Sequence, residues 1–332
     1  MKIYIVASGG GHTGYAIAIA ERILELLPEI DICFILQPND TWSIQRIFRK
    51  LSSNICIMTI SKLRGPLDNS LKMFIRTPQA LFEGFSHIKN PFMVISTGSN
   101  HGIMPIIISK FKKAPFLFTL EDVYRIYSHS KANYLLNKWF DIPVLIQWPE
   151  QKIHFHKAIY LGPIYEKPMY EPSDKGYILV VSGTIGHKRL IKLLLKTDLD
   201  NVVIQSGNIN PDIIRSKKPS WKVFNFDPNI DKWIANASIV IGHQGITVVE
   251  AALAYRKPII IAYNPDIPRT STAIDAMLLA KKINGVFLDT RTADSKDLLK
   301  AIERAREIKP KTFINGAQKF AQMLLRLFIE VI

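Results

Sequence analysis

The feature that most constrains the fold is a repeated series of short, continuous Val- and Ile-rich runs, each followed by a polar or glycine-rich loop and a helical pattern. Runs without alternation are typical of parallel strands that are buried on both faces. Their alternation with helices predicts doubly wound α/β sheets. The predicted strands are residues 3–7, 32–37, 55–60, 93–97, 116–120, 144–147, 158–161, 177–181, 202–205, 222–224, 238–241, 258–262 and 285–288.

The alternation of strand and helix patterns is interrupted once, in the Pro- and Tyr-rich stretch 162–175, and continues after it. A chain of 332 residues is long enough for two cores. We therefore expect two Rossmann-like domains, residues 1–164 and 165–332, with their ligands at the carboxyl ends of the strands in a shared cleft. By chain order the apolar helix expected at 313–332 belongs to the second domain, and we expect it to bridge back to the first.

The two cysteines, Cys33 and Cys56, both lie in apolar strand-like runs. We interpret them as buried thiols in a reducing compartment rather than as a disulfide. The first predicted strand follows Met1 and Lys2 without a signal-peptide pattern, and no run reaches the 18 apolar residues of a membrane span. A cytosolic or peripheral protein is expected.

The formal net charge is +15, and residues 42–120 hold eleven basic residues against two acidic ones, Asp68 and Glu83. Such an excess suits an anionic membrane surface or a nucleic acid, although solvated lysine faces would give the same count. The amphipathic stretch 67–87 combines aromatic and basic residues, with Pro78 expected to break or kink the helix. This pattern favours a helix in a membrane interface, or one that covers the sheet. We predict membrane contact through residues 61–90 and no nucleic-acid partner.

The glycine turn Ser8–Gly14 follows the first predicted strand. Its glycines form a GxGxxG pattern, but no acidic residue ends the second strand to hold a ribose, and Tyr15 stands where a P-loop needs lysine. A generic phosphate site at a helix N-terminus remains. His12 adds a group that titrates near neutral pH, or is a plain helix cap.

Three further glycine-containing loops follow predicted strands, at 97–102, 182–186 and 242–247. In the last of these, the helix start can receive a diphosphate, and Glu250 on the same helix either accepts ribose hydroxyls or is a solvated charge. Asp198-Leu199-Asp200 matches a metal-binding DxD pattern, but it lies at a helix–strand turn, so we interpret it as turn chemistry. No His, Cys and carboxylate cluster has metal-ligand spacing, and we expect no metal or cofactor.

The first half resembles the membrane-recruiting subunit of the eukaryotic two-subunit enzyme that adds the second GlcNAc to dolichol pyrophosphate. The matching segments are 7–13, 97–98, 120–125 and 147–150. The second half resembles that enzyme's catalytic subunit and the C-terminal domain of bacterial MurG, through 182–186 and 242–250. The resemblance spans nearly the whole chain. It implies a GT-B fold and a peripheral enzyme at the cytoplasmic face of the membrane.

The implied reaction is an inverting, metal-independent transfer of GlcNAc from UDP-GlcNAc to a polyprenyl or dolichyl pyrophosphate-linked GlcNAc, as in N-glycan-type lipid-linked oligosaccharides. By this resemblance Glu250 holds the ribose, Thr184 and its neighbours hold the donor pyrophosphate, and the backbone near Phe226 reads uracil. The expected donor-binding residues are Gly183, Thr184, Gly186, Lys188, Phe226, His243, Gly245, Thr247 and Glu250.

An inverting transfer needs a base for the acceptor hydroxyl. We predict His12 in this role, with Glu121 either orienting it or acting as the base itself. The expected acceptor-binding residues are Gly10, Gly11, Thr13, Asn100 and His101.

Two departures from the resemblance affect substrate and membrane contact. Ser271-Thr272 stand where the MurG pattern has adjacent glutamines against the donor sugar, and the N-terminal membrane helix of the eukaryotic subunit has no counterpart here. Alternatives are MurG-like transfer to another polyprenyl pyrophosphate sugar, and a UDP-GlcNAc 2-epimerase, for which no His-Arg-x-Glu-Asn-like segment is found. Two further alternatives are a non-catalytic nucleotide-binding module and a tandem dehydrogenase. The second strand does not end in the acidic residue with which such a dehydrogenase holds a ribose.

Overall fold

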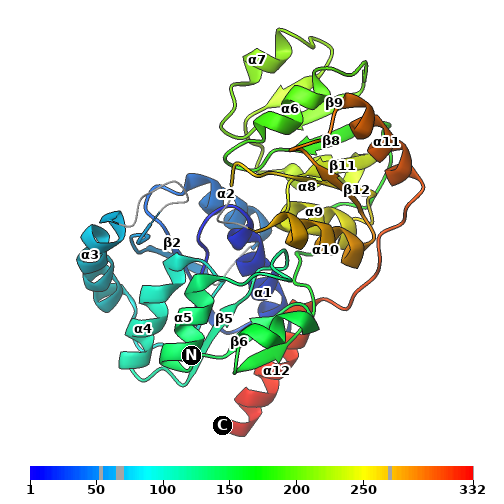
Figure 1. The fold of residues 1–332 in the computed structure, drawn as a ribbon. Helices are drawn as coiled ribbons and strands as arrows, with labels where there is room; N and C mark the ends of the chain where they lie inside the picture. The colour runs from blue at the N-terminus through cyan, green and yellow to red at the C-terminus, as the bar shows by residue number, and fades with distance from the viewer. Residues whose placement is uncertain (52–54, 65–70, 268–270, 332) are drawn as a thin grey trace. The chain divides into compact units, whose positions relative to one another are not determined.

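The computed structural model describes residues 1–51, 55–64, 71–267 and 271–331. The chain divides into two compact units, Met1–Glu166 with Ile314–Ile332, and Lys167–Phe313 (Figure 1). The C-terminal helix, which chain order placed in the second domain, lies in the first unit.

The first unit is built on a parallel seven-stranded sheet with the order β3-β2-β1-β4-β5-β6-β7. Reversal of strand order beside β1 places the ends of β1 and β4 next to each other, where open α/β sheets bind ligands. Its strands are β1 (Lys2–Val6), β2 (Asp31–Leu36), β3 (Ile55–Thr59), β4 (Met93–Ser96), β5 (Phe116–Leu120), β6 (Val144–Ile146) and β7 (Ala158–Tyr160).

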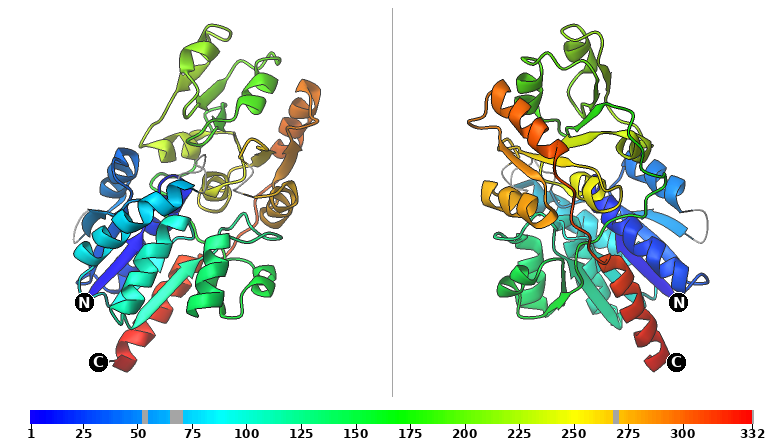
Figure 2. Two further views of the ribbon diagram at one scale, coloured as in Figure 1. Left: turned by 60° about the vertical axis from the view of Figure 1, so that its left-hand side comes forward. Right: turned by 90° about the vertical axis from the view of Figure 1, so that its right-hand side faces the viewer.

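The helices of the first unit connect these parallel strands. Helices α3, α4 and α5 neighbour one another in sequence order, and α1 packs against α2 and α12 (Figures 1 and 2). Their bounds are α1 (Gly11–Leu26), α2 (Thr41–Lys50), α3 (Leu71–His87), α4 (Ile103–Phe111), α5 (Lys131–Phe140) and α12 (Gly316–Val331), with short 3-10 helices η1 (Asn100–Gly102) and η2 (Pro149–His154).

The second unit has a parallel six-stranded sheet with the order β10-β9-β8-β11-β12-β13. Its strands are β8 (Ile178–Val181), β9 (Val202–Gln205), β10 (Lys222–Phe224), β11 (Ile239–Gly242), β12 (Ile259–Tyr263) and β13 (Val286–Asp289). Its helices are α6 (Lys188–Leu194), α7 (Pro211–Arg215), α8 (Ile230–Asn236), α9 (Ile246–Leu253), α10 (Ala273–Ile283) and α11 (Ser295–Arg306).

All the predicted strands are present, with bounds that differ from the prediction by one residue at most. The central ones are fully buried, as the continuous apolar runs required. Of the two outcomes expected at Pro78, a break or a kink, the break does not occur, because α3 continues through this residue. Residues 65–70 of the predicted membrane stretch, and the side chains of 71–74, lie outside the described part of the chain.

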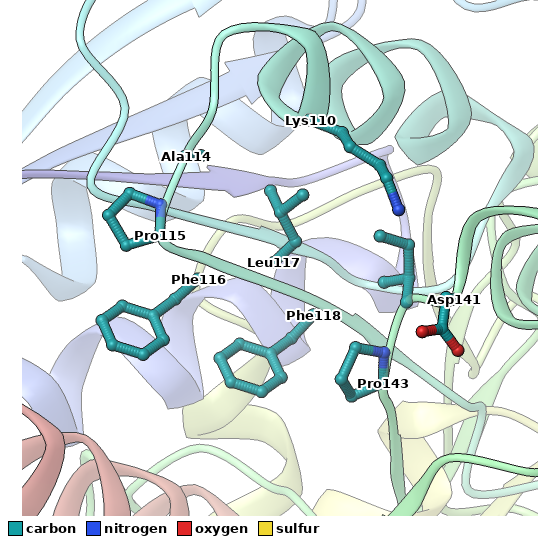
Figure 3. Close-up of a pocket in the computed structure, with 9 residues that line it drawn as sticks. Lys110, Ala114, Pro115, Phe116, Leu117, Phe118, Asp141 and Pro143 are labelled. Atoms are coloured by element: carbon teal, nitrogen blue, oxygen red, sulfur yellow. The ribbon is translucent and has the colours of Figure 1, made fainter.

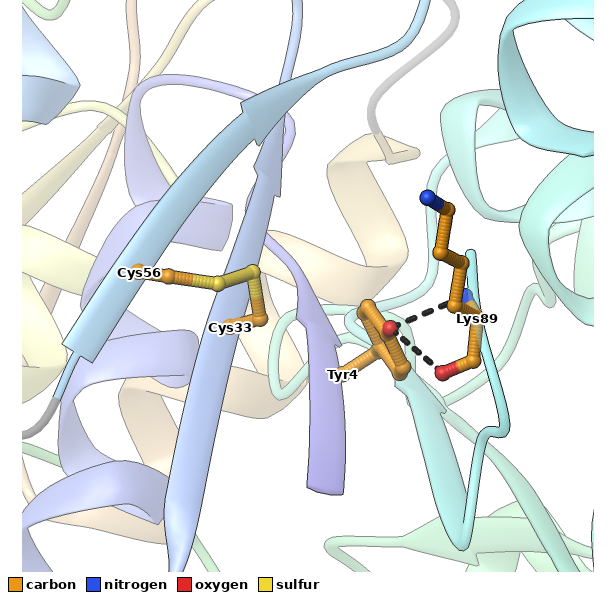
Figure 4. The surroundings of a disulfide bond; sticks show 4 residues. All are labelled: Tyr4, Cys33, Cys56 and Lys89. Atoms are coloured by element: carbon orange, nitrogen blue, oxygen red, sulfur yellow. Dashed lines mark hydrogen bonds between the residues drawn. A yellow bond between two sulfur atoms is a disulfide. The ribbon is translucent and has the colours of Figure 1, made fainter. Parts of the chain in front are cut away.

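The cysteines correct the sequence interpretation, because Cys33 and Cys56 form a disulfide (Figure 4). They stand directly opposite each other in the parallel register of β2 and β3, with their Cα atoms 4.4 Å apart. That separation is within the range that a disulfide spans. Strand register, which no cysteine spacing reveals, brought them together.

Helix α12 joins the core of the first unit through its aromatic face. The Phe320 ring lies 5.6 Å from that of Phe118, and the Phe328 ring lies 4.9 Å from that of Phe92. The first segment of this unit ends at Glu166. This residue is held in place because its buried carboxylate pairs with Arg46 and Lys50 of α2. Both chain segments that leave the first unit are therefore anchored within it.

Candidate active site

The glycine turn of the first unit connects β1 to α1. Gly9 and Gly10 both have positive φ, 87° and 55°, which the turn into the helix requires. Helix α1 begins at Gly11, so His12 occupies its first turn. The sequence prediction of a strand, a glycine turn and a helix N-terminus is confirmed.

The protonation state of His12 follows from its contacts. Its Nδ1 lies 2.6 Å from the carbonyl oxygen of Thr97, at the end of β4. A carbonyl only accepts hydrogen bonds, so Nδ1 carries the proton and Nε2 holds the lone pair. Burial lowers the pKa of His12 below 6.5, against the opposing charge of Asp122. At neutral pH the imidazole is therefore neutral, with Nε2 able to accept a proton.

The carboxylate beside His12 is that of Asp122, whose Oδ1 lies 3.8 Å from His12 Nδ1. Asp122 is also 3.4 Å from the Arg125 guanidinium. The preceding residue, Glu121, is fully buried and accepts hydrogen bonds from the Asp122 and Ser130 amides and from Asn133. Burial, and next the charge of Asp122, raise the pKa of Glu121 to about 8. These contacts tie Glu121 to its own loop and to Ser130 and Asn133 at the start of α5.

The loop that carries Asp122 is held by residues 147–151, which include the segment 147–150 of the resemblance. Gln147 donates to the Glu121 carbonyl, and Trp148 Nε1 donates to that of Val123, each at 2.7 Å. Gln151 Nε2 donates to the carbonyls of Asp122 and Arg125. The motif thus builds the backbone path of the loop.

The predicted acceptor residues divide by exposure. Gly10 is exposed and Gly11 half-buried in the turn, whereas Thr13 is buried with its hydroxyl 2.8 Å from that of Ser43. His101 is buried and bonds the Ile60 carbonyl at 2.8 Å, and Asn100 donates to the Arg64 carbonyl at 2.9 Å. The last two side chains therefore hold the segment that follows β3.

The donor loops predicted in the second unit pack tightly upon one another. Gly183 has a φ of 69°, and a Cβ there would lie 2.3 Å from Cε1 of His243. Gly207, which follows β9 and which the sequence analysis did not single out, would place a Cβ 2.0 Å from the Gly183 carbonyl. Gly245 precedes the first residue of α9, and Gly186 has a φ of 90°. A Cβ at Gly183, Gly186 or Gly207 would lie less than 3 Å from a neighbouring atom, so a larger residue there displaces its surroundings.

The histidines of the second unit are neutral. Burial lowers the pKa of His243 to about 4, and burial followed by the charge of His243 lowers that of His187 to about 4. His187 Nε2 bonds the Ala262 carbonyl at 3.2 Å. Helix starts and backbone amides, rather than imidazolium groups, thus supply the positive potential of these loops.

The remaining predicted donor residues lie in the loops or helices that follow β8, β10 and β11. Glu250 on α9 is buried, which excludes the solvated-charge alternative. Thr184 and Lys188 are exposed, whereas Phe226 and Thr247 are half-buried. Ser271 is buried, and Thr272 caps α10 through a reciprocal pair with Asp275. Asp198 and Asp200 lie in the connection from α6 to β9, as turn chemistry predicts.

A pocket in the first unit lies away from these loops, at the amino ends of β5 and β6. It has a volume of about 300 Å³, and Figure 3 shows its lining residues where β5 begins and before β6. His12 and Asp122 follow the carboxyl ends of β1 and β5. The candidate site is therefore defined by polar groups rather than by this pocket.

The chain has two units, each built on a parallel sheet, and in each unit glycine loops follow the central strands and lead into helices. This is the fold of the GT-B glycosyltransferases. Residues 177–327 match the glycosyltransferase family 28 C-terminal domain. The chain is a GT-B glycosyltransferase related to MurG.

The relatives extend over the whole chain. A UDP-N-acetylglucosamine--N-acetylmuramyl-(pentapeptide) pyrophosphoryl-undecaprenol N-acetylglucosamine transferase of Syntrophotalea carbinolica is 22% identical over 347 residues, covering 94% of this chain and 91% of that protein. The structure of Acinetobacter baumannii MurG has a TM-score of 0.64 at 16% identity and covers 98% of this chain and 99% of its own.

A UDP-GlcNAc 2-epimerase of Neisseria meningitidis, bound to UDP-GlcNAc, also shares the fold. It has a TM-score of 0.55 at 13% identity and covers 99% of this chain and all of its own. Fold similarity alone thus does not separate transfer from epimerisation. The match to the family 28 domain does, in favour of a glycosyltransferase.

Proposed function

We propose that this enzyme transfers GlcNAc from UDP-GlcNAc to a lipid pyrophosphate-linked GlcNAc, with inversion and without a metal. The single observation that carries the proposal is the tautomer of His12. Nδ1 of His12 keeps its proton because it donates a hydrogen bond to the Thr97 carbonyl. Nε2 is then unprotonated and can act as the base for the acceptor hydroxyl. Asp122 stabilises the imidazolium that forms, because its Oδ1 lies 3.8 Å from Nδ1.

In the proposed reaction, Nε2 of His12 takes the hydroxyl proton while the acceptor oxygen attacks the anomeric carbon. The bond from that carbon to UDP breaks, and the diphosphate leaves with the electron pair. The second unit's helix starts and Lys188 stabilise the leaving diphosphate, and Glu250 holds the ribose. The resemblance supports this donor assignment, and the glycine packing around His243 is consistent with a close approach of the ligand to the backbone.

We further propose that the enzyme works at the cytoplasmic face of a membrane, which its first unit contacts through α3. Ile75, Phe82 and Phe85 of this helix are exposed. An exposed apolar surface beside basic residues suits a bilayer interface. Within the described helices, none has the length and apolar character needed to cross a bilayer. Flotation with anionic vesicles is expected to weaken in Phe82→Glu.

A direct transfer assay tests the proposed reaction. Purified protein is incubated with radiolabelled UDP-GlcNAc, or UDP-Glc in parallel, and with a synthetic lipid pyrophosphoryl-GlcNAc. We expect a lipid-linked disaccharide from UDP-GlcNAc and UDP release that depends on the lipid. Release of UDP without an acceptor, together with formation of the 2-epimer, would overturn the proposal.

The MurG-like alternative acceptor is a second candidate, because the Syntrophotalea carbinolica relative is named for an N-acetylmuramyl-(pentapeptide) pyrophosphoryl-undecaprenol acceptor. The proposed GlcNAc acceptor is instead supported by the resemblance of segments 120–125 and 147–150, which form one hydrogen-bonded loop system. Competition between the two lipid acceptors in the same assay separates them.

A further inference from the structure

The segment that follows β3 brings a lysine to the glycine turn. Lys62 Nζ donates to the Ser8 carbonyl at 3.1 Å, although the two residues are 54 positions apart. The side chain of Lys62 is half-buried. An ammonium group has three N–H donors, and one of them is used in the hydrogen bond to the Ser8 carbonyl. The other N–H groups can donate to an anion at the turn.

The position of Lys62 is fixed by side chains on both sides of it. His101 bonds the Ile60 carbonyl, and Asn100 donates to the Arg64 carbonyl. The Ser61 amide and hydroxyl both donate to the Glu83 carboxylate. The segment is thus held from two elements, η1 and α3, and a side chain with a fixed backbone is suited to hold a ligand.

An independent observation at the same turn is the hydroxyl of Ser8. Ser8 is 3% exposed, and within the described residues its Oγ has no hydrogen-bond partner. A buried hydroxyl without a partner is unfavourable until a ligand satisfies it. The Ser8 hydroxyl and the Lys62 ammonium group thus lie at the N-terminal turn of α1, where anions bind.

Asp40 lies at this turn, since a Cβ on Gly9 would be 3.0 Å from its Oδ2. Burial lowers the pKa of Lys62, and the charge of Asp40 opposes that effect and favours the ammonium form. Both carboxylate oxygens of Asp40 accept hydrogen bonds from Ser43, at the start of α2. Asp122 lies beside Arg125 and His12. The charge of Lys62 also reaches His12, since after burial and Asp122 it is the next cause that acts on the pKa of that imidazole, which it lowers. Lys62 therefore lies close enough to serve the same ligand as His12.

From this arrangement we infer that Lys62 and the Ser8 hydroxyl bind the pyrophosphate of the acceptor, and that Lys62 makes the site selective for a pyrophosphate over a monophosphate. This inference rests on the acceptor role proposed above for the first glycine turn. The backbone amides of the turn bind either anion, whereas the lysine supplies the charge that the second phosphate needs. Asn100 and His101, predicted as acceptor ligands, act by positioning the Lys62 segment.

The test compares Lys62→Gln, Lys62→Arg and Ser8→Ala with Lys113→Gln, which removes an exposed lysine at the amino end of β5. Initial rates are measured with the same lipid-linked GlcNAc carried on a pyrophosphate or on a monophosphate. For Lys62→Gln we expect the KM of the pyrophosphate acceptor to rise about ten- to a hundredfold, because one charge-assisted hydrogen bond is lost. The KM of UDP-GlcNAc and that of the monophosphate acceptor change little, and Lys62→Arg restores most of the loss.

Ser8→Ala removes an unpartnered hydroxyl, so the fold is retained, and an acceptor KM about threefold higher is expected from one neutral hydrogen bond. Binding of inorganic pyrophosphate to UDP-saturated protein, measured by calorimetry, examines the site without catalysis. It should weaken in Lys62→Gln and not in Lys113→Gln. Binding to anionic vesicles that contain no acceptor measures general attraction to anionic lipid. In Lys62→Gln this vesicle binding should equal that of the wild type.

An unchanged acceptor KM in Lys62→Gln, or an equal loss of vesicle binding, overturns the inference while wild-type transfer still supports the proposed function. If the wild type transfers to no lipid acceptor, the proposed function fails, and the calorimetric comparison still decides whether Lys62 holds a pyrophosphate.

Discussion

The loops at the carboxyl ends of the two sheets differ in how they carry charge. In the first unit the strand ends bring together His12, Asp122, Arg125 and Lys62, all ionisable. In the second unit the loops consist of close-packed glycines and of histidines whose pKa values burial lowers to about 4. In the proposed reaction the first set of loops moves a proton, and the second presents fixed backbone dipoles to a diphosphate. If the proposal holds, the same fold element, a glycine turn before a helix, serves two kinds of chemistry.

The largest expected effect tests whether proton transfer belongs to the first unit alone. His12→Ala should lower kcat by about 10²–10⁴-fold, the usual contribution of a general base. The affinity for UDP, measured by calorimetry, should not change, because no donor loop is altered. His156→Ala is the matched control, since it removes an exposed histidine of the same unit that bonds Asp141. A normal kcat in His12→Ala would assign the base elsewhere and break the comparison.

A second difference is covalent, since the only cysteines of the chain lie in the first unit. Replacing Cys33 and Cys56 by alanine should lower the local stability of β2 and β3 by about 2–4 kcal/mol, the typical contribution of a disulfide. Hydrogen exchange of their amides should accelerate, while exchange in β8 and β9 stays constant. Wild-type protein under reducing conditions is the matched control. Equal acceleration in both units would show that the disulfide stabilises the whole chain.

How much the sequence revealed differs between strands, turns and side-chain contacts. Strands such as β4 were predictable because burial on both faces demands continuous apolar runs. His12 was predictable because the glycine turn fixes its place at a helix start. The disulfide depended on the register of β2 and β3. That the carboxylate beside His12 is Asp122 could not be predicted, because it depends on the path of a loop that Gln147 and Gln151 hold from a distant segment.

The glycines of the second unit give the next test, which separates backbone strain from ligand space. Gly183→Ala introduces a Cβ that would lie 2.3 Å from the His243 ring. Gly176→Ala is its matched control, with a similar positive φ of 76° but no neighbour closer than 3.7 Å. Both variants lose about 1–2 kcal/mol of stability from the left-handed backbone. Only Gly183→Ala should also raise the KM of UDP-GlcNAc, by about tenfold for a displaced loop. Equal donor KM values in the two variants would remove this loop from the donor site.

The smallest expected effect is a pH shift that sharpens the contrast between the two units. A general base works only when neutral, so activity falls as the pH drops through the pKa of His12, which lies below 6.5. Burial is the main cause of that low pKa, and the Asp122 charge opposes it. Asp122→Asn removes the opposing charge, so the pKa falls further and the acidic limb of kcat/KM should move to lower pH. Asp266→Asn, which removes an exposed carboxylate of the second unit, should leave the profile in place, and a shift toward higher pH in Asp122→Asn would contradict the assignment of His12.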